Sequence, residues 1–403
     1  MIKKVLYVHY LNTLKDGANT HVTEFRKSFG KICERENIEF KTISPGLSEA
    51  STVSKHTPPS KAKMLVKWIG KYYIRDFKII LEQFKHYKKE KAMLEREKPD
   101  IVLARWNARN LSIFYACRSL NIPVCVEING SDTEKSDGEF WVRLPMVETA
   151  LKSRNLVKHV DGAFVVSRIL QREIKDQITF EKDIRVIPNG VDISRFPEDI
   201  NGTAAREKLG IPKDKVVIGY IGTFAPWHRL DKLVEMYKTL SQKYDNLHIL
   251  LIGETYPHGQ DLVKSIEAQN LTENITFTGH VDMQNVPGYV AAMDIAVLPH
   301  TAYYCSPLKL FEYMALKRAV VCIGTEPVKD TMSEDEGITF PEGDMEAMQN
   351  AIEKLIADPD YRKQLGENAR KRISNEFTWD INADKVYGLL KDTYKRVTGK
   401  DPG

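Results

Sequence analysis

The chain has 403 residues, of which 42% are hydrophobic and 28% are charged, with a net charge of +4. That length exceeds one ordinary core and predicts two α/β domains with the composition of a globular protein. No run approaches the roughly 18 to 20 uncharged apolar residues that a bilayer span requires. The five cysteines contain no CxxC pair, which indicates neither a zinc site nor a disulfide framework and suits a reducing cytoplasm.

Short apolar runs in the first half predict strands of a parallel sheet that is covered by helices on both faces. The first run follows Lys3 and Lys4, and because it stops after about six residues we interpret it as a strand rather than a signal peptide. The predicted strands are 4–8, 39–43, 101–104, 124–128, 162–166 and 184–187. Helical patterns fall between them, for example at 20–34, 111–120 and 142–156.

The alternation of strands and helices restarts after a stretch rich in Pro, Asp, Gly and Asn at 188–202, which we interpret as a linker. The second set of predicted strands is 216–221, 247–252, 275–278, 295–298, 319–323 and 337–340. The predicted helices are 231–244, 260–269, 283–293, 308–316 and 345–357, and the last 40 or so residues are helical in pattern throughout. No internal repeat interrupts this order.

Two halves of this kind predict two Rossmann-like, doubly wound domains that face a central cleft, with ligand at the carboxyl ends of the strands. We expect the first domain to cover 1–195 and the second to cover 196–379. The helix from about 380 to 403 is expected to pack back on the first domain.

The most informative run is Cys-Ser-Pro-Leu-Lys-Leu-Phe-Glu-Tyr-Met-Ala at 305–315, which follows a strand and opens a helix. Backbone N–H groups near Ser306 and Leu308 would lie at the helix N-terminus, a favourable place for an anion. Pro307 between them suits a first helical turn, where its missing N–H would have no partner in any case. Lys309 adds a positive charge, and Glu312 shares its face one turn later. A diphosphate and paired ribose hydroxyls fit this arrangement, while an ordinary crossover helix with a surface Lys–Glu pair is the alternative.

This run, together with Arg-Ala-Val-Val at 318–321, resembles the donor-site signature of retaining glycosyltransferases of family 4, which have the GT-B fold. Further matches follow in the family's order. Four further parts of the chain resemble parts of the family's second domain. They are the segment that enters the domain (186–192), the phosphate loop (219–228), the base-contacting region (252–253 with 277–281) and the strand before the signature (294–299). The resemblance covers most of the second half. It implies that the domain over 1–195 binds the acceptor and that the domain over 196–379 binds the nucleotide-sugar donor.

The resemblance implies roles for individual residues. Lys309 would hold the donor diphosphate and Glu312 the ribose. Thr223 and His228 stand near the positions of a phosphate-binding Arg and Lys, and Arg229 replaces a usual glycine. His280 and Val281 would lie beside the base, although a surface turn is the alternative for them.

The remaining predictions concern the transferred sugar. Tyr304 occupies the position at which many family members carry a first glutamate, so we expect sugar recognition to differ here. Gly17 lies in a loop that the family directs toward the donor phosphate and the acceptor. Glu127 and Asn129 end the strand 124–128, and we expect both to face the cleft, with Asn129 beside the sugar.

The segment from Thr52 to Lys98 carries 13 Lys or Arg against 5 Asp or Glu. Within it, aromatic residues alternate with lysines at roughly helical spacing over 61–98. Such a helix would suit an anionic membrane surface and lipid-linked sugar acceptors. Packing of its apolar side on the first domain is the alternative, and no nucleic-acid-binding pattern accompanies the charge.

The resemblance implies transfer of a sugar from a nucleotide-diphosphate sugar to a hydroxyl with net retention, in polysaccharide or glycolipid synthesis. A UDP-sugar is favoured and a GDP-sugar remains open; no metal or other cofactor is expected. The alternatives are an epimerase, a phosphorylase, or a non-catalytic nucleotide-sugar binding subunit on the same fold. We expect a cytoplasmic protein, with membrane contact at most peripheral.

Overall fold

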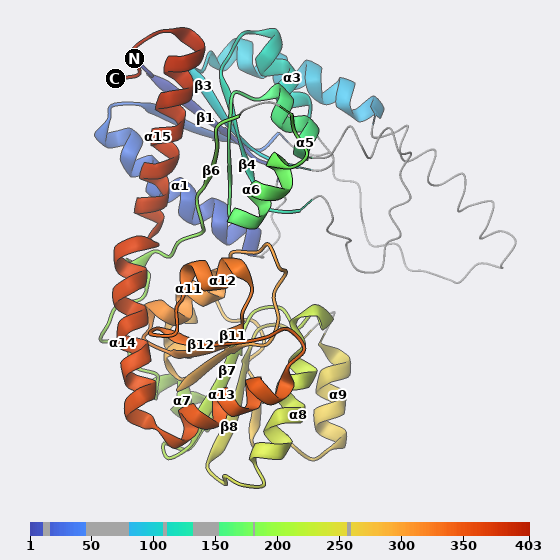
Figure 1. Cartoon of the computed structure of the whole chain (residues 1–403), viewed down its shortest axis with the longest axis vertical. Helices are drawn as coiled ribbons and strands as arrows, with labels where there is room; N and C mark the ends of the chain where they lie inside the picture. The colour runs from blue at the N-terminus through green and yellow to red at the C-terminus, as the bar shows by residue number, and fades with distance from the viewer. Residues whose placement is uncertain (11–16, 46–79, 108–110, 132–152, 180–181, 256–258) are drawn as a thin grey trace, which may run out of the picture. The chain divides into compact units, whose positions relative to one another are not determined.

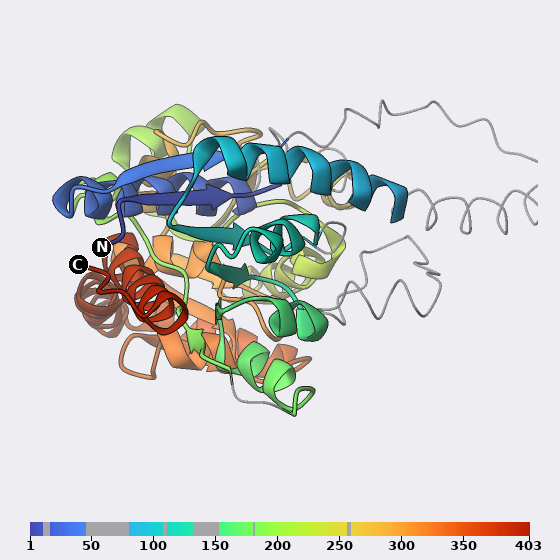
Figure 2. The same cartoon turned by 90° about the horizontal axis from the view of Figure 1, so that it is seen from above.

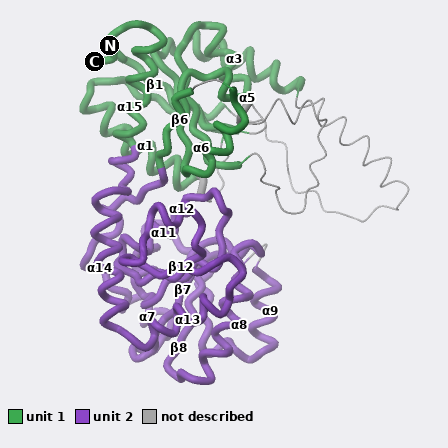
Figure 3. Tube along the Cα trace, viewed as in Figure 1, with its two compact units in different colours: residues 1–187, 383–403 green, residues 188–382 purple. Residues whose placement is uncertain are grey.

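The computed structural model describes residues 1–10, 17–45, 80–107, 111–131, 153–179, 182–255 and 259–403. The chain divides into two compact units (Figure 3). Unit 1 comprises Met1–Ile187 with Ala383–Gly403, and unit 2 comprises Pro188–Asn382. The division therefore falls at Ile187, before the predicted limit at 195, and the end of the chain groups with unit 1.

Unit 1 is built on a six-stranded parallel sheet with the strand order β2-β1-β3-β4-β5-β6 (Figure 1). Its strands are β1 (Lys4–Val8), β2 (Glu39–Ile43), β3 (Ile101–Arg105), β4 (Val124–Ile128), β5 (Gly162–Val165) and β6 (Ile184–Val186). Its helices are α1 (Gly17–Arg35), a helix over 80–97, α3 (Ser112–Ser119), α5 (Ser153–Leu156), η1 (Val157–His159) and α6 (Arg168–Lys175).

Unit 2 repeats this architecture with the strand order β12-β11-β10-β7-β8-β9. Its strands are β7 (Val216–Ile221), β8 (Leu247–Ile252), β9 (Ile275–Phe277), β10 (Ile295–Leu298), β11 (Ala319–Ile323) and β12 (Gly337–Phe340). Its helices are η2 (Ile193–Arg195), α7 (Thr203–Leu209), η3 (Pro226–His228), α8 (Leu230–Leu240), α9 (Gln260–Ala268), α10 (Val286–Ala291), α11 (Leu308–Ala315), α12 (Glu326–Thr331), α13 (Met345–Ala357) and α14 (Pro359–Glu376). The prediction of an α/β, doubly wound fold is confirmed for each unit.

Helix α15 (Trp379–Thr398) begins in unit 2, and its residues from Ala383 onward group with unit 1. Its Thr393 lies against the sheet of unit 1, because the Cys125 thiol is 3.5 Å from the Thr393 hydroxyl. A side chain at Gly162 would come within 2.6 Å of the same hydroxyl, so this glycine permits the close approach. The two ends of the chain lie side by side (Figures 1 and 2), with the Ile2 amide donating to the Pro402 carbonyl at 2.9 Å.

Every predicted strand forms, with bounds that differ by at most one residue. The runs succeed as predictors because most of them are buried on both faces, as in β3, β4, β8 and β11. The clearest departure is the edge strand β2, in which Glu39 and Lys41 are exposed, so the sheet is not apolar on both faces there. Among the helices, the predicted 142–156 lies outside the described residues up to 152.

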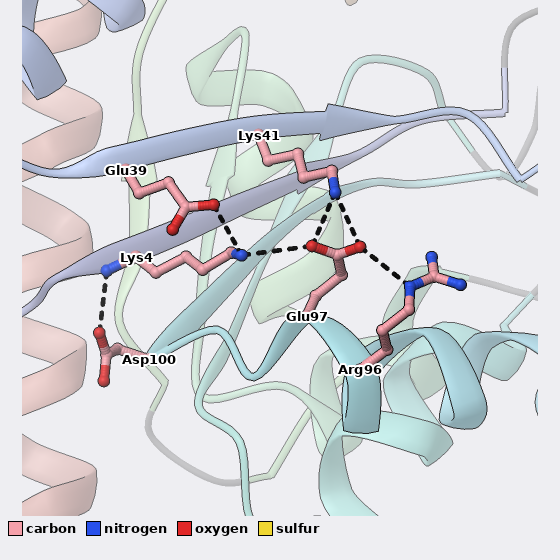
Figure 4. Close-up of polar contacts among 6 residues, drawn as sticks. All are labelled: Lys4, Glu39, Lys41, Arg96, Glu97 and Asp100. Atoms are coloured by element: carbon pink, nitrogen blue, oxygen red, sulfur yellow. Dashed lines mark hydrogen bonds and ion pairs between the residues drawn. The ribbon is translucent and has the colours of Figure 1, made fainter.

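The amino end of the unit 1 sheet is held by a network of charged side chains (Figure 4). The Glu97 carboxylate, at the end of the helix over 80–97, lies 2.8 Å from Lys41, 3.2 Å from Lys4 and 3.2 Å from Arg96. The Lys41 hydrogen bond is the main reason why the pKa of Glu97 falls to about 2. Met93 and Leu94 of the same helix are buried, so the last part of the basic segment packs on unit 1, as the alternative interpretation held.

No helix among the described residues is both long and apolar enough to cross a bilayer. Residues 46–79 lie outside the described part of the chain, so the prediction for 61–98 can be followed only from residue 80 onward.

Candidate active site

The helix α11 begins directly after the loop that follows β10, at the carboxyl end of the unit 2 sheet. It starts at Leu308, one residue later than a first-turn proline would place it, and Pro307 is the residue before it, with an extended ψ of 117°. The Leu310 amide already donates to the Pro307 carbonyl at 3.0 Å. The amides of Leu308 and Lys309 remain in the first turn, where helix geometry leaves N–H groups available to an anion.

The Lys309 ammonium is held at the end of β7 by Tyr220. Its Nζ atom donates to the Tyr220 hydroxyl at 2.7 Å and lies 4.3 Å from the centre of that ring. Tyr220 is fully buried, and its hydroxyl in turn donates to the Thr223 carbonyl at 3.0 Å. Burial lowers the pKa of Lys309 to about 7. Without a bound anion, a large fraction of this lysine is therefore uncharged at neutral pH.

Glycine is required next to this ammonium. Gly222 has a φ of 138°, and a Cβ atom there would lie 2.8 Å from the Lys309 Nζ. Gly253, at the end of the neighbouring strand β8, has a φ of 143°, and its Cβ would come within 2.0 Å of the Gly222 carbonyl oxygen. The two glycines let the ends of β7 and β8 approach each other beneath the start of α11.

His228 approaches the same tyrosine from the short helix η3. The centres of the Tyr220 and His228 rings are 5.6 Å apart. The His228 Nδ1 atom is buried and has no hydrogen-bond partner. Burial, together with the nearby Lys309 charge, lowers the pKa of His228 to about 3, so the imidazole is neutral at neutral pH.

Arg229 adopts the left-handed conformation, with φ 54° and ψ 39°. This is the conformation that glycine favours, so the loop keeps its path although the family's usual glycine is absent. The Arg229 side chain is exposed, with its Nε 3.6 Å from the Asp231 carboxylate. Thr223 contributes its carbonyl to Tyr220 and leaves its side chain exposed.

Ser306 is buried and bonded to the entry segment of unit 2. Its hydroxyl oxygen accepts the Asn189 amide at 3.1 Å, and its carbonyl accepts the Asn189 side-chain Nδ2 at 2.6 Å. The start of α11 is thereby fixed to the segment after Pro188. Asn189 was not predicted as a site residue, although it stands within the quoted 186–192 motif.

Glu312 and Tyr313 lie one turn into α11. Glu312 is partly buried. The hydroxyl of Tyr313, which is fully buried, accepts the Ile221 amide at 2.9 Å. This bond, like the one from Lys309 to Tyr220, joins α11 to the end of β7, so the predicted diphosphate and ribose residues share one rigid support.

The turn after β9 carries the predicted base-contacting residues. His280 is 41% exposed, with Nδ1 3.2 Å from Glu254 and Nε2 3.6 Å from Asp282. Val281 packs partly against the core of unit 2. An isolated bridge pairs Gly253 with Gly279, which brings this turn next to the end of β8.

The predicted residues of unit 1 lie at the carboxyl end of its own sheet. Gly17 is the first residue of α1, which begins three residues before the predicted helix. Asn129 follows β4 directly and donates its Nδ2 to Glu127. Glu127 has no exposed surface, so the expectation that its side chain faces a cleft was wrong.

Comparison with known proteins identifies the family. The family model described as Glycosyl transferases group 1 matches residues 202–372, and the one described as Glycosyltransferase Family 4 matches residues 16–195. The chain belongs to the group 1, family 4 glycosyltransferases. The predicted resemblance is thereby confirmed.

Solved structures of the GT-B fold superpose on nearly the whole chain. A sucrose-phosphate synthase from Thermosynechococcus elongatus matches with a TM-score of 0.73 and 17% identity, over 98% of this chain and 100% of that one. HepE from Anabaena, in complex with UDP and glucose, matches with a TM-score of 0.69 and 16% identity over 97% and 100%. At such identities the likeness shows the fold alone, and the predicted GT-B fold is confirmed.

Curated relatives match a smaller share. An uncharacterised glycosyltransferase of Methanocaldococcus jannaschii is 25% identical over 62% of this chain and 63% of its own length. The capsular polysaccharide biosynthesis glycosyltransferase CapM of Staphylococcus aureus is 25% identical over 53% and 55%. The chain thus spans between about half and two thirds of the curated relatives that it matches.

Proposed function

We propose that this chain is a retaining glycosyltransferase that moves a sugar from a nucleotide-diphosphate sugar to a hydroxyl acceptor. The observation that carries the proposal is the pairing of Lys309 with the first turn of α11, beside the glycine-lined end of β7. A lysine, two first-turn amides and a histidine with a buried Nδ1 that lacks a partner suit two linked phosphates. Glu312, one turn further along α11, would accept hydrogen bonds from the ribose hydroxyls in this proposal.

The chemistry proposed for this site is stabilisation of a leaving group. Bond cleavage at the anomeric carbon leaves negative charge on the diphosphate, which Lys309 and the α11 amides would stabilise electrostatically. The anion would also favour protonation of His228, whose Nδ1 could then donate to a phosphate oxygen. Because these groups supply the positive charge, the proposal includes no metal. Net retention is carried over from the family resemblance.

The donor base and the pathway are proposed from the comparisons. HepE was solved with UDP-glucose, and relatives in Corynebacterium glutamicum and Mycolicibacterium smegmatis are named as GDP-mannose-dependent mannosyltransferases. We favour a UDP-sugar and keep a GDP-sugar as the second candidate. The likeness to CapM, which is named for capsular polysaccharide biosynthesis, supports a role in cell-surface polysaccharide synthesis. The proposal also keeps glycolipid synthesis and a cytoplasmic location.

A product assay separates this proposal from its alternatives. The purified chain is incubated with UDP-glucose, UDP-galactose, UDP-N-acetylglucosamine and GDP-mannose, with and without sugar acceptors. A transferase releases nucleoside diphosphate slowly to water and faster with acceptor. An epimerase yields an epimer or free sugar, a phosphorylase consumes inorganic phosphate, and a binding subunit is stabilised by ligand without turnover.

The variant Glu312→Ala tests the ribose assignment. We expect weaker binding of nucleoside diphosphate and lower turnover with an unchanged melting temperature. Glu334→Ala, which alters an exposed glutamate of unit 2, is the matched control. If Glu312→Ala and Glu334→Ala bind UDP and GDP as tightly as the native chain, the ribose assignment is wrong.

We also propose peripheral membrane contact through the helix over 80–97. Leu81 and Phe84 are 45% and 65% exposed, and the exposed Lys85, Lys88 and Lys89 follow them. Apolar side chains beside lysines suit a bilayer with anionic lipid. Replacing Leu81 and Phe84 with alanine should reduce sedimentation with phosphatidylserine vesicles, whereas Val397→Ala, at another exposed apolar site, should not. Equal sedimentation of all three proteins would refute the contact.

A further inference from the structure

The carboxyl end of the unit 1 sheet contains a buried carboxylate that the function above does not use. Glu127 lies at the end of β4 beside its register partner Arg105 on β3. Its carboxylate accepts the Tyr7 hydroxyl at 2.8 Å and the Arg105 guanidinium, and it lies 3.4 Å from the His21 ring. Burying an ion pair is costly, so its retention here calls for a specific explanation.

The ionisation of Glu127 is settled by its neighbours. Burial alone would raise the pKa of this carboxyl, but Arg105 and His21, with hydrogen bonds from Tyr7 and Asn129, outweigh burial and lower the pKa below its ordinary value. The group is therefore a carboxylate at neutral pH, and a carboxylate can only accept hydrogen bonds.

This fixes which way the Asn129 amide points. The two ends of an asparagine amide are distinguished by their partners, and the end that meets a carboxylate must be the NH₂ group. Asn129 donates its Nδ2 to Glu127 accordingly. The opposite end, Oδ1, is buried and has no hydrogen-bond partner. A buried acceptor without a donor is unfavourable, and a ligand that supplies the donor relieves this cost.

A second buried polar atom without a hydrogen-bond partner lies at the same end of the sheet. Val8 is the register partner of Ala104, so His9 follows on β1 at the level of Arg105. The His9 Nδ1 atom is also buried without a partner. Burial, followed by the charges of Arg26 and Arg105, lowers the pKa of His9, so this imidazole is neutral.

The charges and the unpartnered acceptor at the carboxyl end of the unit 1 sheet decide the class of ligand. The Arg105 guanidinium is already paired with Glu127, and His9 and Asn129 carry no charge. Arg26 adds a positive charge near His9, but the Asn129 Oδ1 atom needs a hydrogen-bond donor, which an anion lacks. A hydroxyl can donate to this amide oxygen and can also bond to a neutral imidazole. An uncharged, hydroxyl-bearing ligand fits the arrangement.

We propose that Glu127 is a positioning residue that holds the Asn129 amide with Oδ1 presented as an acceptor for a sugar hydroxyl. The inference rests on the proposed function, and it gives the expected sugar contact of Asn129 a positioning partner, Glu127, at the ends of β1, β3 and β4 in unit 1. The hydroxyl belongs either to the transferred sugar or to the sugar of the acceptor, because both offer the same chemistry.

The test exchanges donor and acceptor between the two side chains. In Glu127→Gln the partner of Asn129 can donate as well as accept, so the amide is free to turn. The double variant Glu127→Gln/Asn129→Asp restores a fixed donor and acceptor. The glutamine side chain then donates to one oxygen of the aspartate, and the second oxygen of the aspartate becomes the outward acceptor. Asn129→Ala removes the acceptor and leaves the Glu127 network intact. Glu90→Gln is the matched control, because Glu90 is a buried unit 1 glutamate that accepts a tyrosine hydroxyl, that of Tyr10, at 2.7 Å.

Three readouts are compared in all variants. They are the binding of bare UDP and GDP, the release of nucleoside diphosphate from the nucleotide sugar that the native chain uses, and the side-chain ¹⁵N amide signal of Asn129. We expect Asn129→Ala and Glu127→Gln to lower kcat/KM about three- to tenfold, the worth of one hydrogen bond, with unchanged affinity for the bare nucleotide. The double variant should recover much of the loss. A loss already present in hydrolysis without acceptor assigns the hydroxyl to the transferred sugar, and a loss seen only in transfer assigns it to the acceptor.

Failure of the inference differs from failure of the proposed function. If the native chain turns over nucleotide sugars and Asn129→Ala retains full kcat/KM, Asn129 reads no hydroxyl. If the double variant is no better than Glu127→Gln, or if Glu127→Gln leaves the Asn129 amide signal unmoved, Glu127 does not act through Asn129. Absence of turnover by the native chain with every nucleotide sugar would instead overturn the proposed transferase, and the sugar contact of Asn129 with it.

Discussion

The charge state of Lys309 gives the sharpest prediction about donor binding. Burial against Tyr220 lowers the pKa of this lysine to about 7, with Cys305 and Glu312 only partly opposing the shift. A diphosphate requires the ammonium form, so the lysine must be protonated before or during binding. Nucleotide affinity should therefore fall as the pH rises through neutrality.

The size of the effect follows from the protonated fraction of Lys309. With a pKa of about 7, that fraction falls from about 90% at pH 6 to about 10% at pH 8. The dissociation constant for UDP should rise about tenfold over this range, equivalent to about 1.4 kcal/mol. The terminal phosphate loses its second proton near pH 6, which strengthens binding as the pH rises and must be separated from the lysine effect.

Lys309→Arg provides that separation, because a guanidinium keeps its charge throughout this range. Isothermal titration of UDP into both proteins at pH 6, 7 and 8 gives the ratio of their dissociation constants, from which the phosphate term cancels. Titrations in two buffers of different ionisation enthalpy should also show proton uptake by the native chain at pH 8. A ratio that does not change with pH, together with no proton uptake, would refute the reasoning.

The same site makes three further predictions. Lys309 has a lowered pKa in the folded chain and its ordinary pKa in the unfolded chain, so the unfolded chain binds more protons between about pH 7 and 10.5. The free energy of unfolding should therefore rise with pH over this range. Thermal melts of Lys309→Met should lack that rise. Arg229→Gly should raise the free energy of unfolding by about 1 kcal/mol by removing left-handed strain, whereas Arg229→Ala should not; equal urea midpoints for these two variants would contradict the assignment of strain. Gly253→Ala should cost about 2 kcal/mol or more, because its Cβ meets the Gly222 carbonyl. Gly288→Ala, whose Cβ meets no atom within 4 Å and which lies within α10, should melt no lower than the native chain.

The strands could be predicted because burial of a parallel sheet leaves a direct mark on sequence. Runs such as Val-Val-Cys-Ile in β11 are apolar at every position, so neither register nor partner is needed to recognise them. The position of α11 was likewise predictable, since Pro307 ends the preceding extended segment wherever the exact first turn lies. Helix ends were less accurate, and α8 stops four residues before the predicted 244.

The polar contacts within the site could not be predicted in the same way. Tyr220 and Lys309 are 89 residues apart in sequence, and Tyr7 and Glu127 are 120 apart. Local patterns carry no information about such pairs. Glu127 therefore suggested a ligand-facing acid, whereas in the structure it is a buried acceptor for three neighbouring side chains, those of Tyr7, Arg105 and Asn129. A glutamate within an apolar strand correctly indicated a special role, but the sequence did not show which side chains donate hydrogen bonds to it.

Unfavourable local features in unit 2 coincide with the proposed donor site. Arg229, which is not a glycine, is left-handed at a φ of 54°, and Lys309 and His228 are held partly or wholly neutral by burial. Each feature costs the protein free energy, and each lies on the loop after β7 or on α11. Strain and desolvation concentrated in one place are expected where a ligand supplies the compensation. A diphosphate would favour the charged form of Lys309 and allow His228 to donate a hydrogen bond. Ligand binding should therefore offset the free-energy cost of burying these two groups.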